Sequence, residues 1–248
     1  MAKGMLTMFR RCIFPYICIT MYLLFGCGKS EPVYNFDVRD NAFDGSSENI
    51  PVKFPNERSE EEYQRIMTKK LGLYIKENFA GKKAVVIINP YLNVEPPPSL
   101  EGLKAGLGSD VEITEILKPK TPDTTDGKKP DMLIPQEKWF TVKEVNNLLV
   151  GKDFDICITL IGIPADAKMI GRDLNIEALK GKKVFIGGGS IYNLKQAIVD
   201  GTITAAVFYK TDAIYDDKPV PNKLDEAFDK RYVLITKDNV EQHKALFR

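Results

Sequence analysis

Residues 187–190, three glycines followed by a serine, stand between a short apolar run and a helical pattern. Dinucleotide- and phosphate-binding loops have this layout. The run has the first two glycines of G-x-G-x-x-G but not the third, and neither G-x-x-x-x-G-K-[ST] nor G-x-S-x-G occurs in the chain. It therefore predicts a glycine turn in which Ser190 is the N-cap of the next helix, with an anion site at that helix start as the alternative.

Other candidate binding residues follow from where the predicted strands end. Open parallel sheets bind ligands beyond the carboxyl ends of their strands. There, Asn and Asp side chains can bind sugar hydroxyls and Tyr can stack on a sugar ring, although turn and helix-start chemistry also accounts for several of them. The candidate ligand-binding residues are Asn89 and Tyr91 after the first strand, Asp166 after the third, Ser190 and Tyr192 after the fourth, and Tyr209 and Asp212 after the fifth.

Catalytic residue types are scarce in this sequence. His243 is the single histidine, and Cys157 lies in an apolar run that is typical of a buried thiol. The best catalytic candidates are two of Asp153, Asp155 and Asp166 acting as a carboxylate pair, but Asp153 and Asp155 sit at the start of a predicted strand, the wrong end for a site in such a sheet. The formal net charge of +1 does not suggest nucleic-acid binding. We therefore expect no enzyme activity, no metal site and no cofactor.

Alternating strands and helices are expected to position these side chains. Short continuous apolar runs separated by helices are typical of parallel strands covered on both faces. Right-handed crossovers then give a three-layer, doubly wound α/β sheet, Rossmann-like or flavodoxin-like, with the order 2-1-3-4-5 in a single lobe. The strands are expected at 82–90, 111–117, 154–162, 182–188 and 202–210, with a sixth at 230–240. The helices are expected at 59–79, 98–108, 141–151, 165–181 and 190–201, the first capped by Ser59 with Glu62 three residues later and the third capped by Thr141.

The N-terminus has the pattern of an export signal. Lys3, Arg10 and Arg11 precede an apolar run that ends in Leu-Phe-Gly-Cys at Cys27. This ending resembles the lipobox of bacterial lipoproteins, although phenylalanine replaces the usual small or aliphatic residue. The resemblance implies removal of residues 1–26 and a lipid on Cys27, and Gly28 after it implies the outer membrane, facing the periplasm. The alternative is an uncleaved anchor helix.

Residues 27–58 are polar and rich in proline and glycine, which predicts a flexible tether before a domain at 59–248. Within that domain, residues 118–139 contain several prolines and predict either a functional flap or a flexible loop.

Three stretches of the domain resemble type I periplasmic sugar-binding proteins: 70–88, 194–210 and 228–240, the last ending in Thr-Lys-Asp-Asn-Val. The resemblance implies a solute-binding domain for a sugar or another small polar ligand. Because that family clamps its ligand between two lobes and this chain has one, it also implies a missing second lobe. The alternative function is an envelope structural lipoprotein that uses the same fold to recognise another protein.

Overall fold

The computed structural model describes residues 55–90, 95–120, 138, 140–216 and 218–247. All of them belong to one compact unit, Pro51–Arg248. The predictions made for Cys27, for Tyr91 and for most of the 118–139 segment lie outside the described residues. Among the described residues, no helix is both long and apolar enough to cross a membrane.

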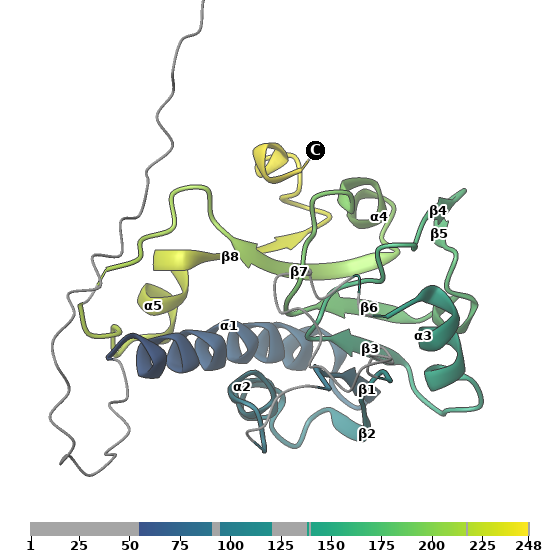
Figure 1. The fold of residues 1–248 in the computed structure, drawn as a ribbon, viewed down its shortest axis with the longest axis horizontal. Coiled ribbons are helices and arrows are strands. Elements are labelled where there is room, and N and C mark those ends of the chain that lie inside the picture. The colour runs from purple at the N-terminus through teal and green to yellow at the C-terminus, as the bar shows by residue number, and fades with distance from the viewer. Residues whose placement is uncertain (1–54, 91–94, 121–137, 139, 217, 248) are drawn as a thin grey trace, which may run out of the picture. The chain divides into compact units, whose positions relative to one another are not determined.

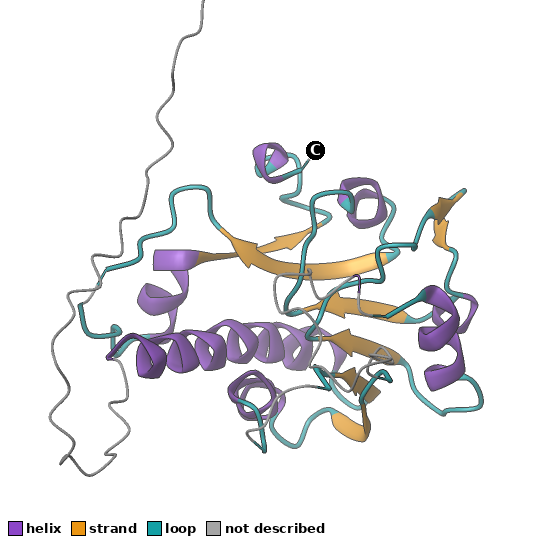
Figure 2. Cartoon of the chain, viewed as in Figure 1, coloured by secondary structure: helices purple, strands orange, loops and turns teal. Residues whose placement is uncertain are grey.

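A mostly parallel sheet organises the described residues (Figure 1, Figure 2). Its strands are β1 (Lys83–Ile87), β2 (Glu112–Leu117), β3 (Ile156–Thr159), β6 (Lys183–Ile186), β7 (Ile203–Tyr209) and β8 (Tyr232–Thr236). Their order is β2-β1-β3-β6-β7-β8, with β8 antiparallel to β7 and the other pairs parallel. The doubly wound prediction and its strand order are therefore confirmed, and the sixth strand forms one edge.

Helices cover both faces of the sheet because both faces of its central strands are apolar. One face carries α1 (Pro55–Phe79), α2 (Pro98–Leu107) and α5 (Leu224–Arg231). The other carries α3 (Val142–Leu149), α4 (Lys195–Val199) and the 3₁₀ helices η2 (Glu177–Leu179) and η3 (Lys244–Leu246). Along β1, Val85 faces the second layer while Ala84 and Val86 face the first, as the period of a strand requires.

Glycines let α1 and α2 approach closely. A Cβ atom at Gly102 would lie 2.1 Å from the carbonyl oxygen of Arg65, and one at Gly106 would lie 2.3 Å from that of Lys69. From the α1 side, a Cβ atom at Gly72 would lie 2.7 Å from the carbonyl oxygen of Leu103. Only glycine fits at these three positions, which bring α1 and α2 into direct backbone contact.

Two predicted helices differ from the structure. Residues 165–181 form an antiparallel pair, β4 (Met169–Ile170) and β5 (Asp173–Leu174), followed by η2. Gly171 between these strands has φ +64°, a left-handed conformation that interrupts a helix. The second difference is Ser190, which is not an N-cap, because α4 begins only at Lys195 and residues 191–194 form a turn. The start of α1 differs as well, because this helix begins at Pro55, four residues before the predicted cap at Ser59.

Candidate ligand-binding site

A cleft of about 200 Å³ lies at the carboxyl ends of β3 and β6. These strands are parallel neighbours, so the loops that follow them leave the sheet at the same edge. Ligands of open α/β sheets bind at this edge. The described residues that line the cleft are Ile163, Pro164, Ala165 and Ala167 after β3, Ser190, Asn193 and Leu194 after β6, and Lys138 before α3.

The two loops are close because glycines remove side chains between them. Gly162 and Gly189 have φ +87° and +78°, and a Cβ atom at Gly189 would lie 2.6 Å from the Cα atom of Gly162. A Cβ atom at Gly188 would lie 2.4 Å from the carbonyl oxygen of Leu160. The glycine run therefore serves a backbone approach between neighbouring strand ends, which accounts for its composition without a phosphate ligand.

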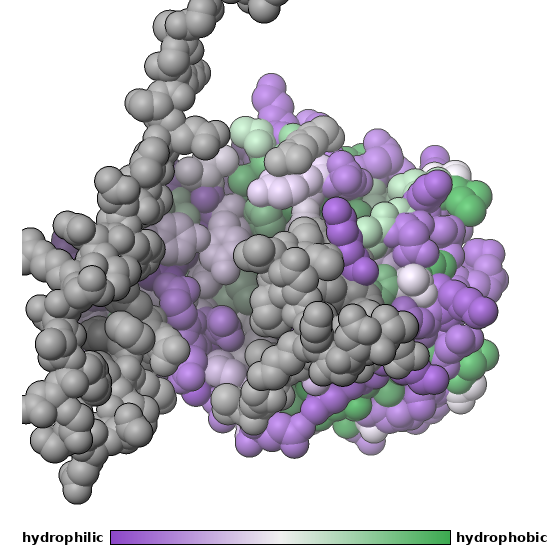
Figure 3. All heavy atoms as spheres, viewed as in Figure 1, coloured by the Kyte–Doolittle hydropathy of each residue, from purple (hydrophilic) through white to green (hydrophobic). Residues whose placement is uncertain are grey.

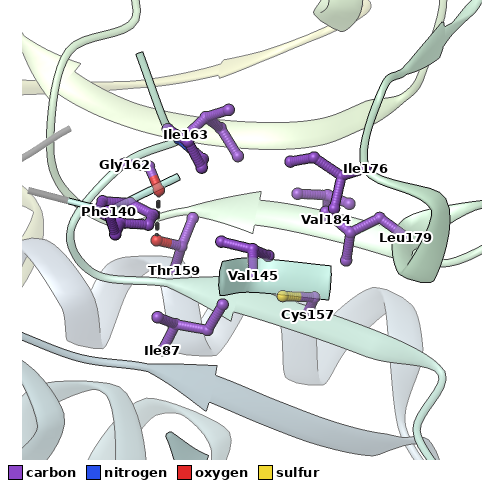
Figure 4. A pocket seen from close by; sticks show the side chains of 11 residues that line it. Ile87, Phe140, Val145, Cys157, Thr159, Gly162, Ile163, Ile176, Leu179 and Val184 are labelled. Carbon is purple, nitrogen blue, oxygen red and sulfur yellow. Dashed lines mark hydrogen bonds between the residues drawn. The ribbon is translucent and has the colours of Figure 1, made fainter. Parts of the chain in front are cut away.

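A buried hydroxyl holds the first of these loops. Thr159, the last residue of β3, is 2% exposed, and its hydroxyl donates to the carbonyl oxygen of Gly162 at 2.6 Å (Figure 4). The hydroxyl oxygen of Thr159 also accepts a hydrogen bond from the backbone N–H of Ile161 at 3.4 Å. Both hydrogen bonds stabilise the turn at residues 159–162, which leads from β3 into the loop that lines the cleft.

Beneath this turn the protein interior is apolar and nearly filled. Figure 4 shows side chains of β3, β6 and α3, among them Cys157, Val184 and Val145, around a small cavity. The volume of this cavity is about 10 Å³, roughly the space that one water needs. Cys157 lines it, and burial raises the pKa of its thiol to about 12. A thiol that stays protonated at neutral pH is a poor nucleophile, so this residue belongs to the packing of the core.

The polar side chains that line the cleft come from two separate segments, Lys138 before α3 and the turn after β6. Asn193 and Lys138 are exposed, and Ser190 is partly buried with its hydroxyl 3.4 Å from the backbone N–H of Tyr192. Asp166 lies between two lining residues, but its carboxylate accepts hydrogen bonds from the backbone N–H of Val142 at 3.0 and 3.3 Å. That contact supports the start of α3, whose predicted N-cap Thr141 is confirmed with a full capping box.

The other candidate residues that the structure describes are not among those that line this cleft. Asn89 follows β1 and is 6% exposed. Tyr192 and Tyr209 both contact the ring of Phe208, with centroid distances of 5.4 and 6.0 Å. Asp212 lines a different hollow of about 240 Å³ beside the edge strand β8. The structure therefore brings Ser190 and the loop of Asp166 together, and links the two tyrosines through Phe208.

Asp153 and Asp155 lie at the amino end of β3, on the far side of the sheet from the cleft, as predicted. Asp153 forms an ion pair with Lys83 at 2.5 Å, and the carboxylate of Asp155 accepts from the backbone N–H of Lys83 at 3.2 Å. The contact with Lys83 lowers the pKa of Asp153. Among the described residues, no group of three or more His, Cys, Asp or Glu side chains could hold a metal ion.

Neither Asn193 nor Lys138 is among the predicted binding residues, although Lys138 belongs to the 118–139 segment predicted as a flap or a loop. Asn193 was assigned to a helix, although a Tyr-Asn pair so soon after a glycine run is compatible with a turn. Lys138 precedes α3, and only the tertiary structure brings it to the loops of β3 and β6.

No protein-family model and no curated protein matches this chain. Solved structures with partial similarity include a sugar ABC transport system substrate-binding protein from Bordetella parapertussis 12822 (16% identity, TM-score 0.39, 58% of this chain and 41% of that chain). Another is an XylFII-LytSN complex (12% identity, TM-score 0.39, 72% and 60%). A third is described as "SPT with PLP" (12% identity, TM-score 0.31, 76% and 44%). This chain thus spans less than two thirds of each, and at these TM-scores the likenesses carry no functional argument.

Proposed function

We propose that this chain is a non-catalytic domain that binds a sugar or another small polar ligand. We further propose that a lipid on Cys27 holds it at the outer membrane of a bacterial cell, facing the periplasm. The observation that carries the ligand proposal is the cleft between the loops that follow β3 and β6. The anchor is supported by the N-terminal sequence, in which basic residues, an apolar run and Leu-Phe-Gly-Cys follow one another.

The side chains around the cleft favour a ligand with hydroxyl or carbonyl oxygens. Lys138 supplies an ammonium donor, Asn193 an amide that donates and accepts, and Ser190 a hydroxyl. None of the described residues that line the cleft is acidic, and Asp166 beside it is engaged with the start of α3. The remaining lining is alanine, leucine, isoleucine and proline, which suits the apolar faces of a small ring.

Thermal unfolding of the full chain tests the ligand proposal. The protein is purified from membranes in a detergent without a sugar head group and is screened against monosaccharides, sugar acids, nucleosides and amino acids. A ligand that binds only the folded state raises the melting temperature in a concentration-dependent way. We expect a sugar or sugar acid to do so, and Asn193→Ala to weaken its binding about tenfold, the loss expected for an amide hydrogen bond.

A matched control is Asn147→Ala, because Asn147 is an exposed asparagine on α3 that does not line the cleft. It should leave the binding constant unchanged. If no small molecule raises the melting temperature while an envelope protein co-purifies with the chain, the alternative function, protein recognition, replaces this one. If a ligand binds equally well to the Asn193→Ala variant, the site lies elsewhere.

The anchor has its own test. Mass spectrometry of the N-terminal peptide from native membranes should show a peptide that begins at an acylated Cys27. An unmodified peptide beginning at Met1 contradicts the proposal, and a Cys27→Ser variant should release the domain from the membrane fraction.

A further inference from the structure

A second surface of the domain exposes aromatic side chains. Tyr209 at the end of β7 is 41% exposed, and Ile214 and Tyr215 in the following loop are 52% and 60% exposed. The two tyrosine rings are neighbours, with centroids 6.3 Å apart and planes 35° apart. We call these three residues the tyrosine platform. None of them lines the cleft.

Two residues at the end of α5, Lys230 and Arg231, hold the loop of the platform in place. The backbone N–H of Ile214 donates to the carbonyl oxygen of Lys230 at 3.0 Å, and the carbonyl oxygen of Ile214 accepts from Nε of Arg231 at 3.3 Å. The guanidinium of Arg231 lies 4.6 Å from the centroid of the Tyr215 ring. Exposed apolar side chains on an ordered loop cost little conformational entropy when a partner binds.

Tyr209 is fixed from the sheet side. Its ring lies 5.1 Å from that of Tyr232, which is 1% exposed, and 6.0 Å from that of Phe208. Tyr209 is the last residue of β7, so the platform lies at the carboxyl end of that strand. In Figure 1, the N-terminal half of α1 and the helix α5 extend beyond this end. Figure 3 shows that hydrophilic side chains dominate the described part of the face in view, with smaller hydrophobic areas between them.

Arg231 and Lys230, which contact or flank the loop, already have acidic partners, and Lys218 after the loop lies close enough to act on the charge of Asp216. Arg231 pairs with Glu60 at 2.6 Å, and Lys230 pairs with Asp216 at 2.6 Å. The acidic side chain of Glu60 is 48% exposed. A carboxylate has acceptor sites left after one contact. The surface therefore offers aromatic faces and hydrogen-bond acceptors, and little attraction for an anion.

We propose that the tyrosine platform binds a neutral polysaccharide, whose sugar rings lay their C–H faces on Tyr209 and Tyr215 and whose hydroxyls donate to Glu60. Balanced charge argues against an acidic peptide or an anionic lipid surface, because neither would find an unpaired cation among the platform contacts named above. This surface would be additional to the cleft, and it holds whether or not the cleft binds a solute.

Calorimetric titration of the full chain with cellohexaose, maltohexaose and chitohexaose, in a detergent without a sugar head group, tests the proposal. At least one hexasaccharide should bind. Tyr215→Ala should weaken it roughly tenfold, since one aromatic contact contributes about 1 kcal/mol. Tyr215→Phe keeps the ring and should bind like the original chain. Ile170→Ala is the matched control, because Ile170 is 69% exposed on β4, outside the platform.

Each other outcome overturns the proposal. It fails if none of the three hexasaccharides binds, or if Tyr215→Ala and Tyr209→Ala both bind with the original affinity. It also fails if Asn193→Ala abolishes hexasaccharide binding while Tyr215→Ala does not, because the cleft would then be the site. Concentration-dependent dimerisation that Tyr215→Ala abolishes would assign the platform to a second copy of this chain. An unchanged melting temperature of Tyr215→Ala excludes unfolding as the cause of lost binding.

Discussion

The guanidinium carbon of Arg231 lies 3.5 Å from the centroid of the Tyr63 ring, which joins the end of α5 to the first half of α1. The side chain of Arg231 is 2% exposed. Burial by itself would lower the pKa of Arg231, but the hydrogen bond and charge of Glu60 outweigh it and leave the pKa above its ordinary value. The cation therefore remains charged in the interior, between an aromatic ring and a carboxylate.

Replacing this cation tests how much the stacking contributes. Arg231→Lys should lower the free energy of unfolding by on the order of 2 kcal/mol, because an ammonium cannot stack on Tyr63 and reach both Glu60 and Ile214. Glu60→Gln should lower it by less than about 1 kcal/mol, since the Glu60 side chain is half exposed. Urea unfolding followed by circular dichroism measures both. Equal losses in the two variants would show that the ion pair, and not the stacking, stabilises this contact.

The glycine run should be sensitive to side-chain size. Gly189→Ala should lower the free energy of unfolding by about 3 kcal/mol, about 1 for the left-handed backbone and about 2 for the collision with Gly162. Gly171→Ala is the control, because Gly171 also has a positive φ but nothing lies within 4 Å of its missing Cβ; it should lose only about 1 kcal/mol. Similar losses in both would contradict a packing role for Gly189.

Replacing Ser190 and Thr141 by alanine compares the stability that a turn serine contributes with the stability that a helix cap contributes. Thr141 accepts from the backbone N–H of Glu144 in a capping box, so Thr141→Ala should cost about 1 kcal/mol of stability. Ser190 caps no helix, and Ser190→Ala should change stability by less than about 0.5 kcal/mol. The two melting curves are compared in one buffer. A large loss at Ser190 would mean that its turn is stabilised by more than the contact to Tyr192.

Cys157 should react only when the domain unfolds. Its pKa is raised from an ordinary value of 9.0 to about 12 by burial, so a short pulse of iodoacetamide at pH 8 should label the Cys157 peptide in urea and not in the native protein. Mass spectrometry of that peptide gives the result. Labelling of the native protein at the unfolded rate would place the thiol at the surface.

The raised pKa of Cys157 also predicts how the stability of the domain depends on pH. Because the unfolded thiol loses its proton at a lower pH than the folded one, its contribution is complete below about pH 9 and is lost as the pH rises towards 12. From pH 9 to 11, the chain should therefore lose stability more steeply than a Cys157→Ala variant, by at most about 1.4 kcal/mol per pH unit. Parallel curves would contradict the raised pKa.

Much of the fold was predictable because its signals are local. A continuous apolar run such as that of β3 indicates a strand buried on both faces, and strands alternating with helices leave few topologies once crossovers are right-handed. The capping residue of α3 was also readable, since Thr141 and Glu144 lie three residues apart. The predicted helix at 165–181 failed because a helical spacing of apolar residues does not reveal that Gly171 takes a left-handed turn.

The candidate site was predictable only as an edge of the sheet. The rule that ligands bind beyond strand ends pointed to the loops after β3 and β6, and Ser190 does line the cleft. Three other features join segments far apart in the chain: Lys138 in the lining of that cleft, the approach of Gly189 to Gly162, and the stacking of Arg231 on Tyr63. The sequence by itself determined which stretches form buried strands and helices, because those choices depend on neighbours a few residues away. Only the tertiary structure decided which polar and aromatic side chains meet, because those contacts depend on loop paths and on packing between distant segments.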